Sequence, residues 1–438
     1  MLLNAADKAL WRLALPMIFS NITVPLLGLV DTAVIGHLDS PVYLGGVAVG
    51  ATATSFLFML LLFLRMSTTG LTAQAWGAKD PQRLARALVQ PLALALGAGV
   101  LIILLRLPLI DLALHIVGGS EAVLEQARRF LEIRWLSAPA SLANLVLLGW
   151  LLGVQYARAP VILLVVGNLL NIVLDLWLVM GLRMNVQGAA LATVTAEYAT
   201  LIIGLLMAKR VLTLRGVSLA MLKNAWRGDL RRLLALNRDI MLRSLLLQLC
   251  FGALTVFGAR LGSDIVAVNA VLMTMLTFTA YALDGFAYSV EAHSGQAYGA
   301  RDGGQLLEVW RAASRQSGMV ALAFALIYSL AGQYIIALLT SLPSLQQLAD
   351  RYLIWQTILP VVGVWCYLLD GMFIGATRGA EMRNSMAVAA AGFAVTLLTL
   401  PVLGNHGLWL ALAVFLALRG LSLALIWRRH WRRGTWFS

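Results

Sequence analysis

The chain has 438 residues, of which 61% are hydrophobic and 12% charged, and an excess of Lys and Arg gives it a formal net charge of +13. Soluble domains carry about a quarter charged residues because they must solvate their whole surface, so this composition argues against a soluble enzyme and against a disordered chain. The two cysteines, Cys250 and Cys366, lie in apolar segments and indicate neither a disulfide framework nor a zinc site. The composition predicts an integral membrane protein.

A helix needs about 20 residues to cross about 30 Å of hydrocarbon. The apolar runs are long and continuous, which predicts helices and not the alternating strands of a barrel. We therefore expect an all-α integral membrane fold with twelve transmembrane helices. The predicted spans are 10–37, 44–72, 88–116, 130–154, 160–182, 188–210, 233–261, 266–296, 309–340, 350–377, 383–403 and 406–429.

Lys and Arg gather in alternate connections between the spans, above all in the stretch 209–238. The positive-inside rule then places both termini of this multi-pass chain in the cytoplasm. The basic stretch is expected to lie along the anionic leaflet, with a regulatory site as the alternative. The piece 118–135 carries Glu125 and Arg129 at helical i,i+4 spacing and is expected to be a solvated helix extension.

An internal repeat divides the chain. The segment Gln74-Ala-Trp-Gly-Ala-Lys-Asp80 recurs as Gln296-Ala-Tyr-Gly-Ala-Arg-Asp302, at an offset of 222 residues. The same offset relates Gly36 to Gly258 and Gly153 to Gly375. Several anchors at one spacing predict two homologous six-helix lobes, related by an axis along the membrane normal. The predicted limits are 1–210 for the first lobe, 211–232 for a cytoplasmic basic linker and 233–438 for the second lobe.

The sequence lacks the motifs of known catalytic and nucleotide-binding sites. It has no phosphate-binding G-x-x-x-x-G-K-[ST] segment, no H-E-x-x-H pair, no C-x-x-C and no G-x-S-x-G. We expect no enzyme activity, no metal or other cofactor, and no nucleotide or nucleic-acid partner. Any work that the protein performs would then draw on an ion gradient.

Acidic residues inside spans are costly, so each is a functional hypothesis. Asp31 lies in the first span, where burial would raise the pKa of its carboxyl group and favour proton exchange. Pro16 and Pro25 in the same span remove backbone hydrogen bonds and predict bends. The alternative for Asp31 is a solvated position at the end of the helix.

The fifth and sixth spans carry polar stripes. Asn168, Asn171 and Asp175 are spaced by three and four residues and share one helical face, and Thr193 and Glu197 do the same on the next span. Such stripes are expected to face the interior of the bundle, either as a binding site or as hydrogen bonds between helices.

The second half has its own intramembrane charges. Asp284 and Glu291 lie seven residues apart in the eighth span, and Asp370 lies in the tenth. They could pair with Arg243 in the seventh span or line a path for a cation. The sequence leaves both alternatives open.

The repeat, the segment Val30-Asp31-Thr32-x-x-x-Gly36 and the pair Asn171-x-x-x-Asp175 resemble the multidrug and toxic compound extrusion (MATE) family, and within it the DNA-damage-inducible branch. The resemblance covers the whole chain and implies a multi-pass protein of the bacterial inner membrane. It implies two six-helix lobes forming a V and cation-coupled export of organic molecules. It also implies that Asp31 is the protonation site and that Asn171, Asp175 and Thr193 belong to its polar network.

The resemblance also bears on the coupling ion. Sodium-coupled relatives place acids in helices 7 and 10. Asp370 matches the second of these, but the seventh span has Arg243 and Gln248 and no internal carboxylate, since its one acid, Asp239, lies near its start. This departure favours protons over sodium.

The sequence thus predicts a proton-coupled antiporter that exports amphipathic or cationic compounds. A sodium-coupled antiporter, a flippase for lipid-linked precursors and a membrane enzyme or receptor without transport are the alternatives. The expected partners are small organic substrates and membrane lipid, with the protein itself a monomer.

Overall fold

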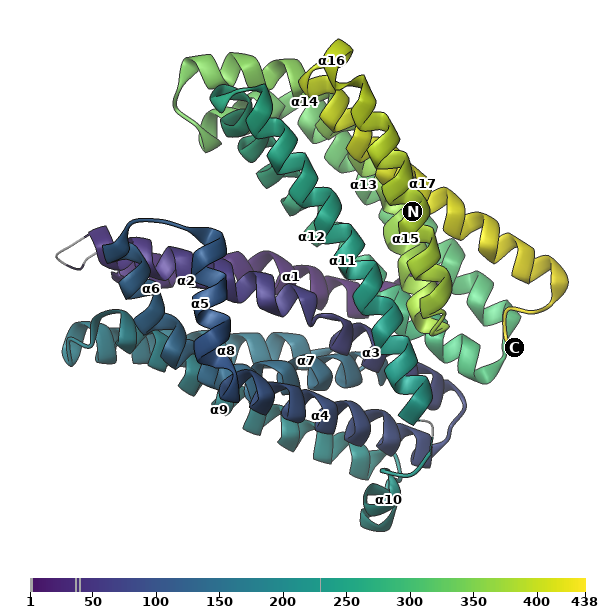
Figure 1. Ribbon diagram of the computed structural model, residues 1–438. Helices are drawn as coiled ribbons and strands as arrows, with labels where there is room; N and C mark the ends of the chain where they lie inside the picture. The colour runs from purple at the N-terminus through teal and green to yellow at the C-terminus, as the bar shows by residue number, and fades with distance from the viewer. Residues whose placement is uncertain (1–2, 36–37, 39–40, 229) are drawn as a thin grey trace. The chain divides into compact units, whose positions relative to one another are not determined.

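The computed structural model describes residues 3–35, 38, 41–228 and 230–438, with the side chains of 23–33 left outside the description. Every regular element in these residues is helical (Figure 1). The contacts divide the chain into two compact units, one of residues Phe19–Leu233 and one that joins Met1–Ile18 to Leu234–Ser438. The all-α prediction is confirmed, and the lobe limits at 210 and 233 stay a prediction.

The first unit is built from α2 to α10, together with the second part of α1. The bounds are α1 (Ala5–Ile35), α2 (Pro41–Leu60), α3 (Phe63–Gly77), α4 (Pro81–Leu104), α5 (Arg106–Val117), α6 (Glu121–Arg134), α7 (Ala138–Gly153), α8 (Arg158–Asp175), α9 (Asn185–Leu214) and α10 (Leu219–Asn224). A π-helical turn, Leu176–Gly181, continues α8, and a short 3-10 turn, Trp135–Ser137, joins α6 to α7.

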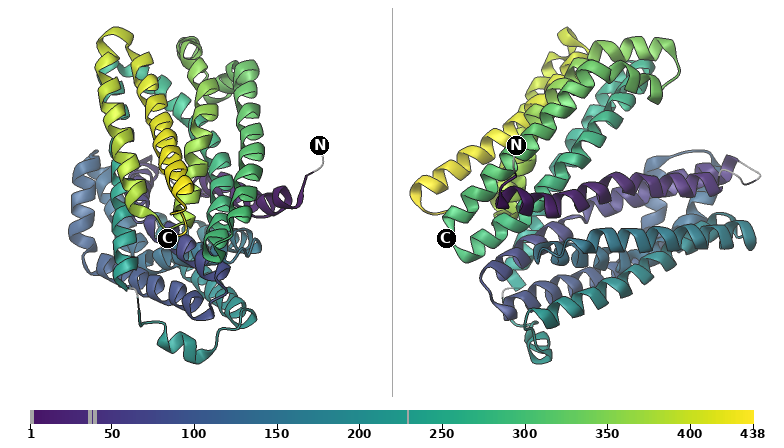
Figure 2. Two further views of the ribbon diagram at one scale, coloured as in Figure 1. Left: turned by 90° about the vertical axis from the view of Figure 1, so that its right-hand side faces the viewer. Right: turned by 180° about the vertical axis from the view of Figure 1, so that it is seen from behind.

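The second unit contains α11 to α17 and the first part of α1. Its helices are α11 (Leu230–Leu261), α12 (Ser263–Ala300), α13 (Gly303–Leu339), α14 (Pro343–Gly375), α15 (Gly379–Thr396), α16 (Leu400–Leu403) and α17 (Asn405–Arg433). Within this unit α15 and α17 run side by side (Figure 2). In the described part of the chain, 11 helical segments are long and apolar enough to cross a membrane. The 31-residue α1 adds a twelfth, in agreement with the predicted count.

The start of α1 is fixed to helices of the second unit. Arg315 on α13 donates to Asp7 Oδ1 at 3.0 Å, and the indole nitrogen of Trp11 donates to Gln316 Oε1 at 3.1 Å. The hydroxyl of Ser289 on α12 donates to the carbonyl of Leu10 at 2.8 Å. These contacts explain why the first 18 residues cluster with the second unit, although the repeat places them in the first half of the sequence.

The two prolines of α1 do not interrupt its helical backbone, which is continuous over Ala5–Ile35. Pro16 is half-buried, and the side chain of Pro25 lies outside the described residues. A bend at either proline therefore remains a prediction.

The segment 118–135 differs from its prediction. The pair of Glu125 and Arg129 does form, at 3.0 Å and exposed, but α6 packs against α2 and buries its other face. Phe130 is buried, and the indole nitrogen of Trp135 donates to Thr54 Oγ1 at 3.0 Å. The prediction of a solvated extension is wrong because one face of α6 carries apolar side chains at helical spacing, and they belong to the core.

The internal repeat appears in the local geometry. Lys79 and Arg301, which occupy the same place in the two copies of the motif, both adopt φ 53°. The next residue in each copy is an aspartate that caps the following helix: Asp80 accepts from the backbone nitrogens of residues 82 and 83, and Asp302 from that of residue 305. The same turn thus begins α4 and α13, as an N-cap aspartate favours.

Helix packing repeats in the same way. A Cβ added to Gly153 at the end of α7 would lie 2.7 Å from the Cβ of Thr72, and one added to Gly375 at the end of α14 would lie 2.5 Å from the Oγ of Ser294. Thr72 and Ser294 are themselves 222 residues apart. Both glycines therefore let corresponding pairs of helices approach closely.

Candidate functional site

A cavity of about 340 Å³ lies within the first unit, between α7, α8 and α9. Apolar side chains, among them Phe58, Leu145, Leu148 and Leu163, form much of its wall. The polar part of the wall consists of Ser20, Ser141, Asn144, Asn168, Asn171, Thr193, Glu197 and Thr200. A mixed wall of this kind, mostly apolar with a few placed polar groups, is typical of a site for small molecules.

Helical periodicity explains how these residues come together. Asn168 and Asn171 lie three residues apart on α8, and Thr193, Glu197 and Thr200 recur at four and three residues on α9. Residues at these spacings share one face of a helix, so the packing of α8 against α9 brings both stripes to the same cavity. Asp175, the third member of the α8 stripe, is fully buried at the end of the helix.

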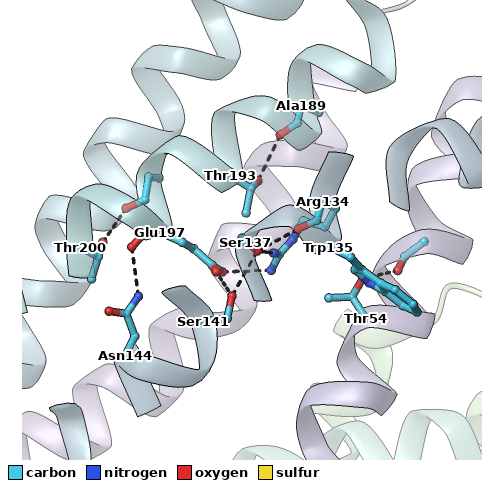
Figure 3. Close-up of polar contacts among 12 residues, drawn as sticks. Thr54, Arg134, Trp135, Ser137, Ser141, Asn144, Ala189, Thr193, Glu197 and Thr200 are labelled. Carbon is cyan, nitrogen blue, oxygen red and sulfur yellow. Dashed lines mark hydrogen bonds and ion pairs between the residues drawn. The ribbon is translucent and has the colours of Figure 1, made fainter. Parts of the chain in front are cut away.

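Glu197 is the carboxylate of this wall. Its Oε1 accepts a hydrogen bond from Arg134 Nη2 at 3.0 Å, and its Oε2 accepts one from the hydroxyl of Ser141 (Figure 3). Asn144 on α7 donates from Nδ2 to the backbone carbonyl of Glu197 at 3.2 Å. Both carboxylate oxygens are therefore engaged, and α9 is tied to α6 and α7.

Arg134 has further partners of its own. It donates to the hydroxyl oxygen of Ser137, and its guanidinium lies 5.5 Å from the centroid of the Phe58 ring. Its side chain is 11% exposed, against 25% for Glu197. Sequence reasoning missed this residue because it assigned Arg134 to a solvated connection. The apolar face of α6 was the signal that could have placed it inside the protein.

Two threonines of α9 donate their hydroxyl protons to backbone carbonyls of the same helix. Thr193 donates to the carbonyl of Ala189 at 3.2 Å and Thr200 to that of Ala196 at 2.8 Å, one turn back in each case (Figure 3). A hydroxyl bonded in this way keeps its lone pairs for another donor. The polar wall is therefore rich in hydrogen-bond acceptors.

The second unit holds a different arrangement of charges. Arg243 on α11 donates to Asp370 Oδ2 at 2.7 Å, and Arg419 on α17 donates to the same oxygen. All three side chains are buried. Of the two alternatives for these charges, the structure shows ion pairing for Asp370 and Arg243. The partner that sequence reasoning missed is Arg419, which lies on a distant helix.

The other two acids that the sequence analysis singled out in the second half lie on α12. Glu291 is buried, and its carbonyl oxygen faces Gly375 where α12 packs on α14. Asp284 is half-buried, two turns earlier on the same helix. The side chain of Asp31, the predicted protonation site, lies outside the described residues.

Comparisons with known proteins agree with this architecture. The sequence model of the MatE family matches residues 16–177 and 240–403. The chain is 87% identical over 436 residues to "DNA damage-inducible protein F" of Escherichia coli K12, covering all of this chain and 95% of that protein. It is 26% identical to "Protein DETOXIFICATION 45, chloroplastic" of Arabidopsis thaliana, over 98% of this chain and 79% of that protein.

Solved structures share the fold. One described as "MATE in the bent conformation" superposes with a TM-score of 0.84 at 22% identity, covering 98% of this chain and 96% of that chain. A transporter of the MOP superfamily from Pyrococcus furiosus superposes with a TM-score of 0.83 at 23% identity, with the same coverage. The two matched segments of the MatE model and the 222-residue repeat describe one duplicated fold. The chain therefore belongs to the MatE family and is a multi-pass membrane transporter, not an enzyme.

Proposed function

We propose that this transporter is a proton-coupled antiporter that exports amphipathic, often cationic, organic compounds from the cytoplasm. The observation that carries the proposal is the cavity of the first unit. It combines apolar walls with a carboxylate and several hydrogen-bond acceptors. An amphipathic cation needs both kinds of contact, because its hydrocarbon part favours burial and its charge needs a partner.

The proposed coupling site is Asp31, which the family resemblance makes the protonation site. The buried α8 residues Asn171 and Asp175 belong to the polar network implied around it. Asn171 Oδ1 is buried without a hydrogen-bond donor among the described residues. A protonated carboxyl group or a water could supply that donor, so the environment suits a group that gains and loses a proton.

The second unit supports protons over sodium. A sodium site needs several oxygen ligands that converge on one ion. Asp370 matches a sodium-site acid of relatives, but its carboxylate already lies between Arg243 and Arg419. Two arginines on one carboxylate leave little attraction for another cation. We propose further that the protein lies in the bacterial inner membrane with both termini in the cytoplasm, and that it works as a monomer without cofactors.

Purified protein in liposomes tests the proposal directly. Flux of the fluorescent cation ethidium would be followed under an imposed pH gradient and, separately, under a sodium gradient, for the wild type and for Asp31→Asn. We expect flux driven by protons and lost in the variant. Exchange of one proton for one monovalent cation moves no net charge, so the pH gradient drives it, and each pH unit provides about 1.4 kcal/mol, enough for a ten-fold cargo gradient.

The other outcomes decide against parts of the proposal. Flux driven by sodium alone would move the coupling site away from Asp31. Full proton-driven export by Asp31→Asn would reject that residue as the coupling site. Absence of flux under both gradients would reject drug antiport and make the flippase for lipid-linked precursors the next function to test.

A further inference from the structure

The pair of Glu197 and Arg134 is asymmetric with respect to the cavity. Among the described residues, the cavity is lined by Glu197 and Ser141 but not by Arg134. Figure 3 shows the carboxylate between α9 and the place where α6 ends at Arg134 and the Trp135–Ser137 turn begins. A molecule in the cavity would therefore meet the negative member of the pair first.

Arg134 does not depend on Glu197 alone. Its guanidinium also contacts the hydroxyl of Ser137 and lies near the ring of Phe58, which itself lines the cavity. If another cation took over the carboxylate, Arg134 would keep both of these contacts. A cation over an aromatic face is stabilised by the charge distribution of the ring.

The buried cluster in the second unit provides a contrast. Asp370 is 7% exposed, and two buried arginines, Arg243 and Arg419, both bond to its Oδ2. Among the residues that the structure describes, Glu197 pairs with one arginine, and it lines the open cavity. The first arrangement is suited to a permanent link between helices, and the second to an exchange of partners.

We propose that Glu197 selects the cargo by its charge, exchanging its ion pair with Arg134 for one with an organic ammonium that carries N–H donors. Arg134 is the internal cation that keeps the carboxylate paired while the cavity is empty. This inference rests on the proposed export function and names the substrate class of its site. The carboxylate is paired before and after the exchange, so it is never a buried anion without a cation. Arg134 gives up its anion and keeps the neutral contacts with Ser137 and Phe58.

The rest of the wall specifies the type of cation. Thr193 and Thr200 donate their hydroxyl protons to backbone carbonyls, so their oxygens can accept a hydrogen bond, and Asn144, which donates one N–H to the carbonyl of Glu197, adds its Oδ1 as a third acceptor. An ammonium with two or three N–H groups can satisfy such acceptors together with the carboxylate, whereas a quaternary ammonium cannot. Protonated amines are therefore the favoured cargo.

Two fluorescent probes of nearly one size separate charge from shape. Dansylcadaverine carries a primary ammonium, and its N-acetyl derivative replaces that group with an uncharged amide. Binding of each to detergent-solubilised protein would be measured by dansyl fluorescence. For the wild type we expect the ammonium probe to bind about ten-fold or more tightly than the amide, as a charge-assisted hydrogen bond implies.

The variants make the inference specific. Glu197→Gln should remove most of the preference for the ammonium probe and leave the affinity for the amide probe unchanged. Arg134→Gln should instead raise the affinity for the ammonium probe, since the carboxylate loses its internal competitor. The matched control is Glu125→Gln, which breaks an ion pair of the same 3.0 Å length on the exposed side of α6 and should change neither affinity.

The opposite results would overturn the exchange. Equal weakening of both probes by Glu197→Gln would make the pair a structural link, and so would a loss of ammonium binding in Arg134→Gln as large as that in Glu197→Gln. Gel filtration and melting temperature establish whether each variant is folded. If Glu197→Gln does not fold, the same probe affinities are measured for Arg134→Gln and Glu197→Asp instead. Gradient-driven flux of dansylcadaverine in liposomes tests the export function separately. If Glu197→Gln transports this probe as the wild type does and keeps the same preference for the ammonium, the inference about Glu197 is rejected while the export function stands.

Discussion

The ion pair of Arg134 and Glu197 joins the helical segment 121–153 to α9. The corresponding helices of the second half are also joined by an ion pair, but the positions of its cation and anion are exchanged. In the first half the cation lies on the 121–153 segment and the anion on α9. In the second half the anion, Asp370, lies on α14, which is residues 343–375, and the cation, Arg419, lies on α17. The duplication thus conserved a link between two helices while its charges diverged.

The stability of the second unit should depend strongly on its central carboxylate. Asp370→Asn leaves Arg243 and Arg419 buried without their shared anion, which we expect to cost about 3–5 kcal/mol. The measurement is the melting temperature of the detergent-solubilised protein. Asp111→Asn, which breaks the exposed pair with Arg128, is the control and should shift it little. A melting temperature equal to that of the wild type in Asp370→Asn would show that the cluster is not a structural link.

Two glycines of α4 should respond to the same substitution with opposite signs. A Cβ at Gly99 would lie 2.3 Å from the Cα of Pro139, a backbone atom that cannot move aside, so Gly99→Ala should destabilise the first unit. Among the described atoms, nothing lies within 4 Å of a Cβ at Gly97. Gly97→Ala should therefore stabilise α4 by about 0.5–1 kcal/mol, through its higher helix propensity.

Thermal unfolding of the two variants, prepared in parallel, checks this pair of predictions. The two substituted glycines lie two residues apart on one helix, so effects on expression and on detergent binding are matched. Equal melting temperatures would show that α4 and the start of α7 are not in close contact at Gly99.

Hydropathy and periodicity were sufficient for much of this structure. The apolar runs predicted the spanning helices, the 222-residue offset predicted the shared turn at Asp80 and Asp302, and the spacing on α8 and α9 predicted two polar stripes. These features depend on neighbours within a few residues, or on comparing one half of the chain with the other.

The charge partners could not be predicted in this way. Arg134 and Arg419 meet their acids only after helices distant in the sequence have packed, and neither position has a local pattern that names its partner. For Arg134 the prediction also failed because it was based on the charged residues of α6 and not on the apolar face of the same helix. A single sequence shows which charged residues are costly to bury, but it does not show which of them form ion pairs with one another.

Trp436 should be a principal anchor of the last residues of the chain. Its side chain is 1% exposed and packs edge to face on Phe373, with ring centroids 5.1 Å apart, while Arg378 donates to the carbonyls of Thr435 and Trp436. The guanidinium of Arg378 also lies 4.9 Å from the ring of Trp436. Trp436→Ala removes all of the ring contacts at once and should cost about 3–5 kcal/mol of stability.

Limited proteolysis and the melting temperature would measure this effect. We expect Trp436→Ala to melt earlier and to expose the end of α17 to cleavage at its arginines, because the residues after Arg433 would lose their packing against α14. Trp226→Ala is the control, since that side chain is 63% exposed and its removal leaves no cavity. Wild-type protection of the arginines in Trp436→Ala would mean that the backbone hydrogen bonds to Arg378 hold the end of the chain without the ring.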